Sequence, residues 1–463
     1  MINMKPLALA VLTAGAVGST NLALAGGSDA VDDRIAALDA QVAELTAILA
    51  AQQQANVVQE ETIAANTASI QTNVADIEEA RPMAKGTKFT YGGFIQLDMS
   101  ASNYGEGKPG NDLIEDFLVP SLIPVESSSG NSDSYSTSNL HAKTSRFFFT
   151  TATDTDAGKI STRVELDFLL GGGGDERISN SWNSRLRHAF VKWDYDEGKS
   201  LLAGQSWSTF FNVGALPNQI DFVGPVGTLF NRQPQIRWTT GGLQLALENP
   251  ATRLNQNILV EDEDTGESEP TLSTSFDDFH EGIPDIVARY NGKAGGLSWS
   301  IAGIARELAY ETDTDDDSQF GYGLSLAGKW VFGQDDLRFM VNYGDALGRY
   351  LGLNAFNDGY IDASGDIDTI DQWGAFIAYQ HFWSSQWSSS FTLSMSQADN
   401  PSESEFIHAK SLAESYQSAH ASLWYSPAPK YSMGGELIYA TKELEDGRDG
   451  DMSRFQFAVK YAF

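Results

Sequence analysis

Residues 454–463 read RFQFAVKYAF, and this stretch decides the fold. Phe455, Phe457, Val459, Tyr461 and Phe463 occupy every second position, and the positions between them include two cations and a glutamine. Successive side chains of a β-strand point to opposite faces, so one face of this segment is wholly apolar. We expect it to be the last strand of a membrane-spanning β-barrel. Its terminal Phe463 resembles the signal that the barrel-insertion machinery recognises.

The same alternation returns along the chain from Lys88 onward and predicts sixteen strands. Their expected ranges are 88–100, 142–153, 159–170, 182–195, 199–205, 234–240, 243–248, 284–290, 297–308, 320–332, 336–344, 371–383, 387–398, 415–426, 430–441 and 453–463. Short and long connections alternate between them, which is typical of bacterial outer-membrane barrels. Residues 83–463 are therefore expected to form an all-β transmembrane barrel of sixteen antiparallel strands with long extracellular loops. A water-soluble β-sandwich is the alternative, but it would not leave an apolar face at every strand.

Composition excludes several classes of function. Lys and Arg number 30 and Asp and Glu 62, giving a formal net charge of −32. That charge argues against nucleic acid as a partner, because phosphate binding needs a basic surface. The chain has no cysteine, which excludes disulfides, thiolate metal ligands and thiol nucleophiles. Residues 1–25 predict a secretory signal peptide, with Lys5 before an apolar run and Ala23-Leu24-Ala25 as the cleavage site.

Residues 26–82 are expected to form a periplasmic, trimeric, α-helical coiled coil. Six apolar a positions of the heptad are Ile35, Val42, Leu49, Ile63, Ile70 and Ile77. The second half combines Ile at a with Asn at d, and Ile at a favours three strands over two. Arg81-Pro82 ends the helix, since proline cannot continue it. A single amphipathic helix packed on its own domain is the alternative.

Successive residues of a barrel strand face lipid and lumen in turn, and we call this alternation parity. It predicts which charged side chains line the lumen, because a charge facing lipid costs about 2–4 kcal/mol. The predicted pore-lining and substrate-contacting residues are Arg146, Arg163, Arg185, Arg187, Arg237 and Arg289. Arg338 and Arg454 also take the inward parity, whereas that of Arg306 is ambiguous. Rings of arginine select anions in pores. Alternatively, inward acids such as Asp98, Glu165, Asp167, Glu248 and Glu436 pair with these arginines and only hold the wall together.

The loop 206–233 differs from the other long connections, because it is rich in aromatic residues and has a single acid. We expect it to fold into the barrel and narrow the channel. Its candidate constriction residues are Trp207, Phe210, Phe211, Asp221 and Arg232. A latch between the subunits of a trimer is the alternative reading of this loop.

The remaining motifs favour neither an enzyme nor a cofactor protein. Loop 249–283 is strongly acidic and could bind divalent cations, but it lacks EF-hand spacing, so a solvated face is the plainer interpretation. His420 and Ser422 share an inward face, whereas a barrel lipase needs its nucleophile facing lipid. We therefore expect no catalytic residue, no cofactor and no resident metal.

Four runs of sequence carry a family resemblance: Ala203–Phe210, Arg185–Phe190, Asp221–Gly227 and Arg232–Arg237. Together with the coiled coil before the barrel, they resemble the DcaP-like trimeric outer-membrane porins over nearly the whole chain. The resemblance implies trimers with a periplasmic coiled coil, and diffusion of small anions, notably dicarboxylates, through a constriction that contains arginine. It suggests Arg185, Arg187 and Arg237 as pore residues. The very acidic loops depart from the family pattern.

The expected function is passive diffusion of small anionic solutes across the bacterial outer membrane by a homotrimer. Expected partners are membrane lipid and lipopolysaccharide, with peptidoglycan a candidate partner of the coiled coil. Two alternatives stay open. One is a porin without anion preference, and the other is an envelope tether whose barrel is a plugged anchor.

Overall fold

The structure, a computed structural model, describes residues 42–43, 46, 86–128, 130, 133–169, 174–175, 179–261, 268–274, 279–280, 282–312 and 315–463. The chain divides into two compact units, Met1–Met83 and Ala84–Phe463, and the second is the barrel. The predicted signal peptide and nearly all of the predicted coiled coil lie outside the described residues. Among the described residues, no helix has the length and apolar character needed to cross a membrane.

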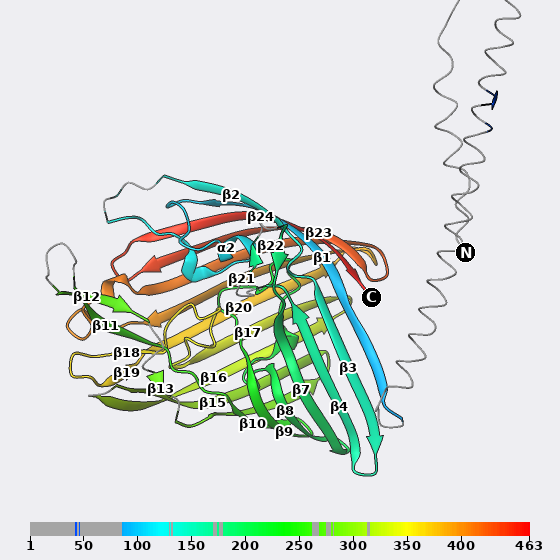
Figure 1. Cartoon of the computed structure of the whole chain (residues 1–463), viewed down its shortest axis with the longest axis horizontal. Helices are drawn as coiled ribbons and strands as arrows, with labels where there is room; N and C mark the ends of the chain where they lie inside the picture. The colour runs from blue at the N-terminus through cyan, green and yellow to red at the C-terminus, as the bar shows by residue number, and fades with distance from the viewer. Residues whose placement is uncertain are drawn as a thin grey trace, which may run out of the picture. The chain divides into compact units, whose positions relative to one another are not determined.

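Sixteen antiparallel strands close into a barrel (Figure 1). In order around the wall they are β1 (Lys88–Tyr104), β3 (Arg146–Thr155), β4 (Gly158–Asp167), β7 (Arg185–Asp196), β8 (Lys199–Trp207), β9 (Arg232–Thr240), β10 (Leu243–Glu248), β14 (Asp285–Ala294), β15 (Leu297–Glu311), β16 (Asp316–Phe332), β17 (Asp335–Asp345), β20 (Asp371–Phe382), β21 (Trp387–Asp399), β22 (Ala413–Ala428), β23 (Tyr431–Leu444) and β24 (Asp449–Ala462).

Strand β24 pairs with β1 from Phe94↔Ala462 to Tyr104↔Met452 and closes the barrel. Closure matters because an unpaired strand edge cannot be satisfied in lipid. The predicted sixteen-stranded antiparallel barrel is confirmed, and each predicted range overlaps one of these sixteen wall strands.

The predicted strand 142–153 is wrong at its start. Strand β3 begins at Arg146, and residues 135–141, expected to be loop, form β2 (Tyr135–His141), which pairs with the second half of β1. A side chain interrupts the ladder between them. The Ser145 hydroxyl accepts a hydrogen bond from Gln96 N at 3.1 Å and donates one to Gln96 O at 3.2 Å. It satisfies both backbone groups that a continuous strand would have paired.

The remaining elements lie in the long connections. They are α2 (Leu113–Asp116), η1 (Pro120–Leu122), β5 (Gly174–Asp175), β6 (Ser181–Trp182), η2 (Val213–Ala215), β11 (Leu254–Glu261), β12 (Ser268–Ser273), β13 (Phe279–His280), β18 (Gly359–Ile361), β19 (Ile367–Thr369) and η3 (Ala409–Ser411). The long connections leave one end of the barrel. The two-residue turns and the other short connections lie at the other end, which we call the short-turn end.

Along each wall strand, apolar side chains are exposed and polar side chains are buried, which is the reverse of the pattern in a soluble protein. In β1 the apolar Ile95, Leu97 and Met99 are exposed, whereas Gln96 and Asp98 are buried. The apolar face thus surrounds the barrel as a surface for lipid, and the polar face turns inward.

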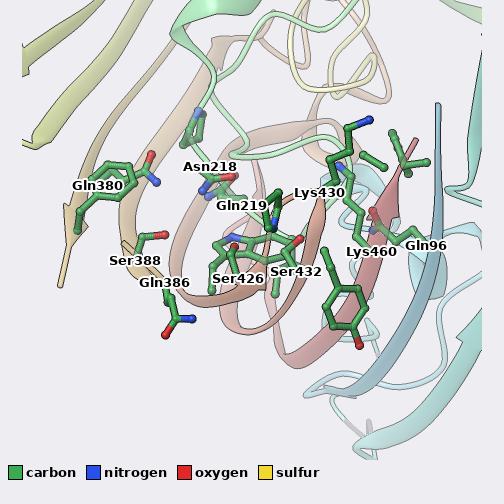
Figure 2. A pocket seen from close by; sticks show the side chains of 18 of the residues that line it. Gln96, Asn218, Gln219, Gln380, Gln386, Ser388, Ser426, Lys430, Ser432 and Lys460 are labelled. Carbon is green, nitrogen blue, oxygen red and sulfur yellow. The ribbon is translucent and has the colours of Figure 1, made fainter. Parts of the chain in front are cut away.

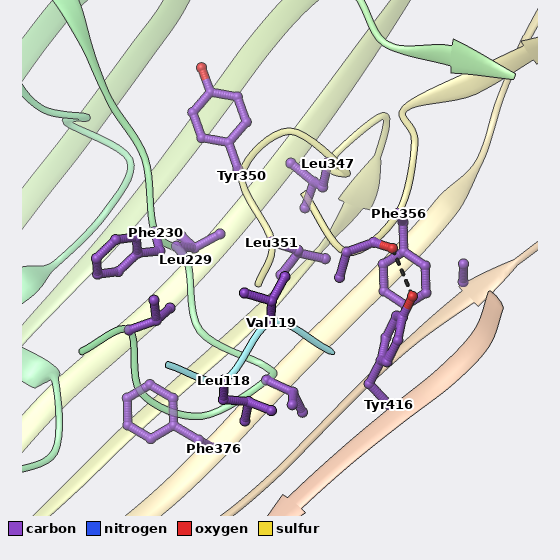
Figure 3. Packing of buried hydrophobic residues seen from close by; sticks show 14 of the residues in the cluster. Leu118, Val119, Leu229, Phe230, Leu347, Tyr350, Leu351, Phe356, Phe376 and Tyr416 are labelled. Atoms are coloured by element: carbon purple, nitrogen blue, oxygen red, sulfur yellow. Dashed lines mark hydrogen bonds between the residues drawn. The ribbon is translucent and has the colours of Figure 1, made fainter. Parts of the chain in front are cut away.

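An apolar core also lies inside the barrel, which the strand pattern alone did not predict. Three long connections supply it together with inward wall residues such as Phe376 and Tyr416 (Figure 3). The connection after β1 contributes Leu118, the one after β8 contributes Leu229, and the one after β17 contributes Leu351. Inward folding therefore extends to parts of the segments 105–128 and 346–370, which we expected to be ordinary surface loops.

Candidate functional site

The connection between β8 and β9, residues 208–231, lies against the inner wall of the barrel. Gly227 N donates to Ser394 Oγ at 2.7 Å, and Asn342 Nδ2 donates to Gly227 O at 3.1 Å. A Cβ added to Gly227 would lie 2.4 Å from Ala375 O, so the loop backbone touches the wall too closely for a side chain. Phe210 and Phe211 are fully buried in the core of this loop.

The tip of this loop is held by the predicted His–Ser face of β22 and by Glu436 of β23. Glu436 Oε2 accepts hydrogen bonds from the backbone N–H groups of Ile220 and Asp221, and its Oε1 lies 2.8 Å from His420 Nδ1. Ser422 Oγ donates to Asn218 O at 3.2 Å. These polar side chains bind the loop, so their inward parity has a positioning role.

Asp221 ties the loop to the connection after β1. Its carboxylate accepts hydrogen bonds from Leu118 N at 2.7 Å and Gly224 N at 3.1 Å. Burial raises the pKa of the Asp221 carboxyl, and the neighbouring charge of Glu436 adds to the shift. The inserted connections thus form one hydrogen-bonded body within the barrel.

The structure brings four of the six predicted pore arginines together on the walls of β3, β4 and β7. Glu165 Oε1 lies 3.5 Å from Arg146 Nε and 2.8 Å from Arg187 Nε, and its Oε2 lies 3.1 Å from Arg163 Nε. Asp167 binds Arg185 through two contacts of 2.6 and 3.1 Å and Arg187 Nη1 at 2.7 Å.

Two carboxylates therefore serve four guanidinium groups in this cluster. Arg187 is buried and fully paired, whereas the side chains of Arg163 and Arg146 keep 31% and 23% of their surface exposed. The pairing that the alternative interpretation required is present, but it leaves a positive surplus.

Phe222, at the loop tip, is surrounded by this cluster. The guanidinium carbons of Arg187, Arg185 and Arg146 lie 5.3, 5.4 and 6.0 Å from its ring centroid. A cation over an aromatic face is attracted by the ring quadrupole. Phe222 was not among the predicted constriction residues, although it belongs to the aromatic set that marked the loop.

The other predicted arginines, on β9 and β14, contact the start of the loop. Arg232 is 4.6 Å from the Trp207 ring, and no carboxylate lies within salt-bridge distance of it in the part of the chain that the structure describes. Arg237 donates to Thr209 Oγ1 at 2.8 Å, and Arg289 donates to Phe211 O at 2.8 Å. The last two therefore fasten the loop.

Arg306, whose orientation the parity left ambiguous, is buried inside the barrel. Its Nη1 lies 2.8 Å from Asp358 Oδ1 and its Nε 3.6 Å from Asp285 Oδ1. Because Asp358 belongs to the connection after β17, this ion pair fixes that connection to the wall.

Below the loop tip lies a cavity of about 980 Å³ at the short-turn end. Its walls carry five cationic side chains, namely Arg146, Lys329, Arg338, Lys430 and Lys460, and two acidic ones, Asp221 and Asp336. Figure 2 shows Gln96, Lys430 and Lys460 on one side and Gln380, Gln386 and Ser388 on the other. Asp336 is already bound by Arg338 at 2.7 Å and Lys329 at 3.1 Å.

The sequence analysis did not predict Lys460 as a site residue, although its position in the final strand indicates that it faces the lumen, as Arg454 does. Likewise, Arg338 and Asp336 occupy two lumen-facing positions of one strand, so their pairing could have been predicted.

The fold is similar to that of a known outer-membrane channel. The crystal structure of the outer membrane channel DcaP of Acinetobacter baumannii is 21% identical, with a TM-score of 0.65 over 82% of this chain and 99% of that chain. At this identity the likeness concerns the fold. Outer-membrane-expressed OmpT of Vibrio cholerae is 9% identical, with a TM-score of 0.46 and coverage of 82% and 99%. OprB of Pseudomonas putida is 11% identical, with a TM-score of 0.43 and coverage of 80% and 94%.

Among curated proteins, none matches this chain in sequence. The sequence model of the DcaP outer membrane protein, by contrast, matches residues 23–463, which is nearly the whole chain. The chain belongs to the DcaP outer membrane protein family.

Proposed function

We propose that the protein is a passive outer-membrane channel for small anionic solutes such as dicarboxylates. The observation that carries the proposal is the arginine cluster around Phe222. Among the described residues, Arg146, Arg163, Arg185 and Arg187 share two carboxylates there, Glu165 and Asp167, and Arg232 lies nearby over the Trp207 ring without a carboxylate in salt-bridge distance. The family and the fold support a channel, and the surplus of guanidinium groups supports the sign of its preference.

Electrostatics favour the constriction over the acidic mouth. Two charges in a partly shielded site, at an effective dielectric of about 20, interact by about 2–4 kcal/mol at separations of roughly 4–8 Å. A dianion facing two guanidinium groups gains charge-assisted hydrogen bonds. Acidic loops beyond about 8–10 Å are largely screened at physiological salt. A solute at the cluster therefore experiences mainly the arginines.

The proposal includes the assembly expected from the sequence. The signal peptide 1–25 directs export, the segment 26–82 is a periplasmic coiled coil, and the channel is a homotrimer in contact with lipid and lipopolysaccharide. Peptidoglycan is the candidate partner of the coiled coil. The acidic residues of loop 249–283 are taken as a solvated face.

One observation favours the second candidate, a plugged envelope anchor. Apolar side chains of three inserted connections, including Phe117, Phe230 and Tyr350, are buried within the barrel. A barrel sealed by this core would hold the envelope together without conducting.

Proteoliposome swelling separates the candidates. We expect vesicles carrying the purified trimer to swell faster in sodium succinate than in a size-matched cationic solute paired with an equally large anion. No swelling in any small solute supports the plugged anchor, and equal rates support a porin without preference.

A further inference from the structure

Cations and aromatic rings alternate along one wall of the barrel, from the loop down to the short-turn cavity. Arg187 lies 5.8 Å from the Trp207 ring and 5.3 Å from the Phe222 ring. Arg146 lies 6.0 Å from Phe222 and 5.2 Å from Phe94, and Lys460 Nζ lies 3.9 Å from Phe94. The upper part of this series belongs to the constriction already described, whereas Arg146, Phe94 and Lys460 lie at its lower end.

Strand register produces this lower group. Phe94 of β1 stands directly opposite Arg146 of β3 and Ala462 of β24, and Lys460 is two residues from Ala462. Diagonal neighbours on one face remain within reach of long side chains. The two cations can therefore be no farther apart than the sum of their distances to the Phe94 centroid.

Neither charge is fully compensated. Within the described residues, no carboxylate lies within salt-bridge distance of Lys460. Asp98, the inward acid on β1, accepts hydrogen bonds from Gln96 Nε2 at 2.8 Å and from the Thr144 hydroxyl. Among the described residues, the carboxylate within salt-bridge distance of Arg146 is that of Glu165, at 3.5 Å and shared with Arg163 and Arg187, while Asp167 acts on it from farther away. Arg146 Nε is buried and has no hydrogen-bond partner.

Arg146 and Lys460 both line the short-turn cavity, where the Gln96 amide also faces. An ammonium offers three donors and a guanidinium offers a planar set of five. Two undercompensated cations and an amide on one patch of a water-accessible cavity match a carboxylate or phosphate group of a small dianion.

We propose that Arg146 and Lys460, straddling Phe94, form a second anion subsite below the constriction, open to the periplasm. This inference rests on the proposed anion channel and deepens it. Phe222 contacts Arg146 from above, so an anion released by Arg185 and Arg187 meets a second cationic site at once. Conduction is favoured when successive sites bind well enough to admit a solute and weakly enough to release it.

Lys329 offers a matched control. It lines the same cavity, but unlike Lys460 it has a carboxylate within salt-bridge distance: its ammonium lies 3.1 Å from Asp336, which it shares with Arg338. Lys460→Gln and Lys329→Gln remove the same charge from the same cavity. Lys460→Arg keeps the charge and tests whether packing over Phe94 alone is responsible.

The experiment measures block of a chloride current by succinate added to the periplasmic side of the full-length trimer in a planar bilayer. We expect K460Q to raise the half-blocking concentration about fivefold, the upper end for a partly exposed ion pair. K329Q and K460R should stay near wild type, and block from the extracellular side should change less. Heat-dependent gel mobility verifies that each variant is a folded trimer.

Two results would overturn the subsite in distinguishable ways. If succinate blocks the wild-type channel but K460Q and K329Q have equal effects, the second subsite is contradicted and the proposed anion channel still holds. If the wild-type channel prefers cations and succinate blocks it from neither side, both proposals are contradicted.

Discussion

The guanidinium of Arg187, on the barrel wall, lies 5.3 Å from the ring centroid of Phe222, at the tip of the inserted loop. Arg187 is also held by Glu165 and Asp167, so the contact joins a fixed wall cluster to the loop that lies inside the barrel. The position of the loop and the charge of the proposed constriction are therefore coupled.

Removal of two cluster cations should cancel the positive surplus of the cluster. In Arg185→Ala/Arg187→Ala, the carboxylate of Asp167 loses both of its arginine partners, while Glu165 keeps Arg146 and Arg163. We expect the anion-to-cation permeability ratio to fall about tenfold, equivalent to about 1.4 kcal/mol. Reversal potentials under a salt gradient measure this ratio, and succinate uptake should slow in parallel.

A control for that variant uses two cations at the short turns. Lys192 and Lys199 are each paired with a neighbouring acid, Asp194 at 2.6 Å and Asp196 at 2.7 Å. Lys192→Ala/Lys199→Ala should leave the ratio unchanged. If both double variants shift the ratio equally, net charge and not the cluster sets the preference.

The inserted loop can lie close to the wall because Gly227 has no side chain. In Gly227→Ala, the new Cβ would meet backbone atoms of Ala375 and Met395 at 2.4–2.5 Å, so the loop must move away from the wall. Overpacking of this kind costs about 1–3 kcal/mol. We expect a lower unfolding temperature and, because the loop is displaced toward the lumen, a smaller single-channel conductance.

Gly110→Ala is the matched control, because a Cβ there meets nothing within 4 Å. It should leave both properties unchanged. An unaltered conductance in a folded Gly227→Ala trimer would show that this loop does not set the width of the channel.

Deletion of Phe463 should lower assembly. The ring packs 6.0 Å from that of Phe147, and Phe463 N donates to Gly93 O at 3.1 Å, where the last and first strands meet. Its loss weakens both barrel closure and the expected insertion signal. Outer-membrane levels, measured by fractionation and surface labelling, should fall, and wild-type levels would contradict the assignment.

Deletion of residues 30–80 should weaken the trimer without abolishing it, since barrel walls also bury surface against one another. Cross-linking and native mass measurement of detergent-solubilised protein give the proportion of trimers. The intact chain should yield three copies, and a monomer after mild extraction would argue against the assembly.

Much of the barrel was predictable from sequence, because the constraint behind it is simple. Lipid accepts only apolar side chains, so the two-residue period of segments such as 454–463 is strict and marks both the strands and their faces. The same parity identified Arg163 and Arg185 as inward residues. A hydroxyl that replaces backbone pairing, as Ser145 does, leaves no periodic trace, so the break before β3 was missed.

Contacts between inward-facing side chains were not predictable in the same way. Parity places Glu165 and Arg187 inside but does not show that their side chains meet, because that depends on register and on the bulge between β4 and β7. The insertion of the segment 105–128 depends on contacts such as the hydrogen bond from Leu118 N to the Asp221 carboxylate, which joins residues about a hundred positions apart. Aromatic content identified one inward loop, and the other two carry weaker signals.

The central claim is that the barrel conducts and that its arginine cluster favours anions. The most direct measurement is the reversal potential of the wild-type trimer in a planar bilayer across a tenfold potassium chloride gradient. We predict open channels whose reversal potential has the sign of chloride selectivity, more clearly at ordinary ionic strength than at low salt. Silent bilayers, or a reversal potential with the sign of potassium selectivity, would contradict the account.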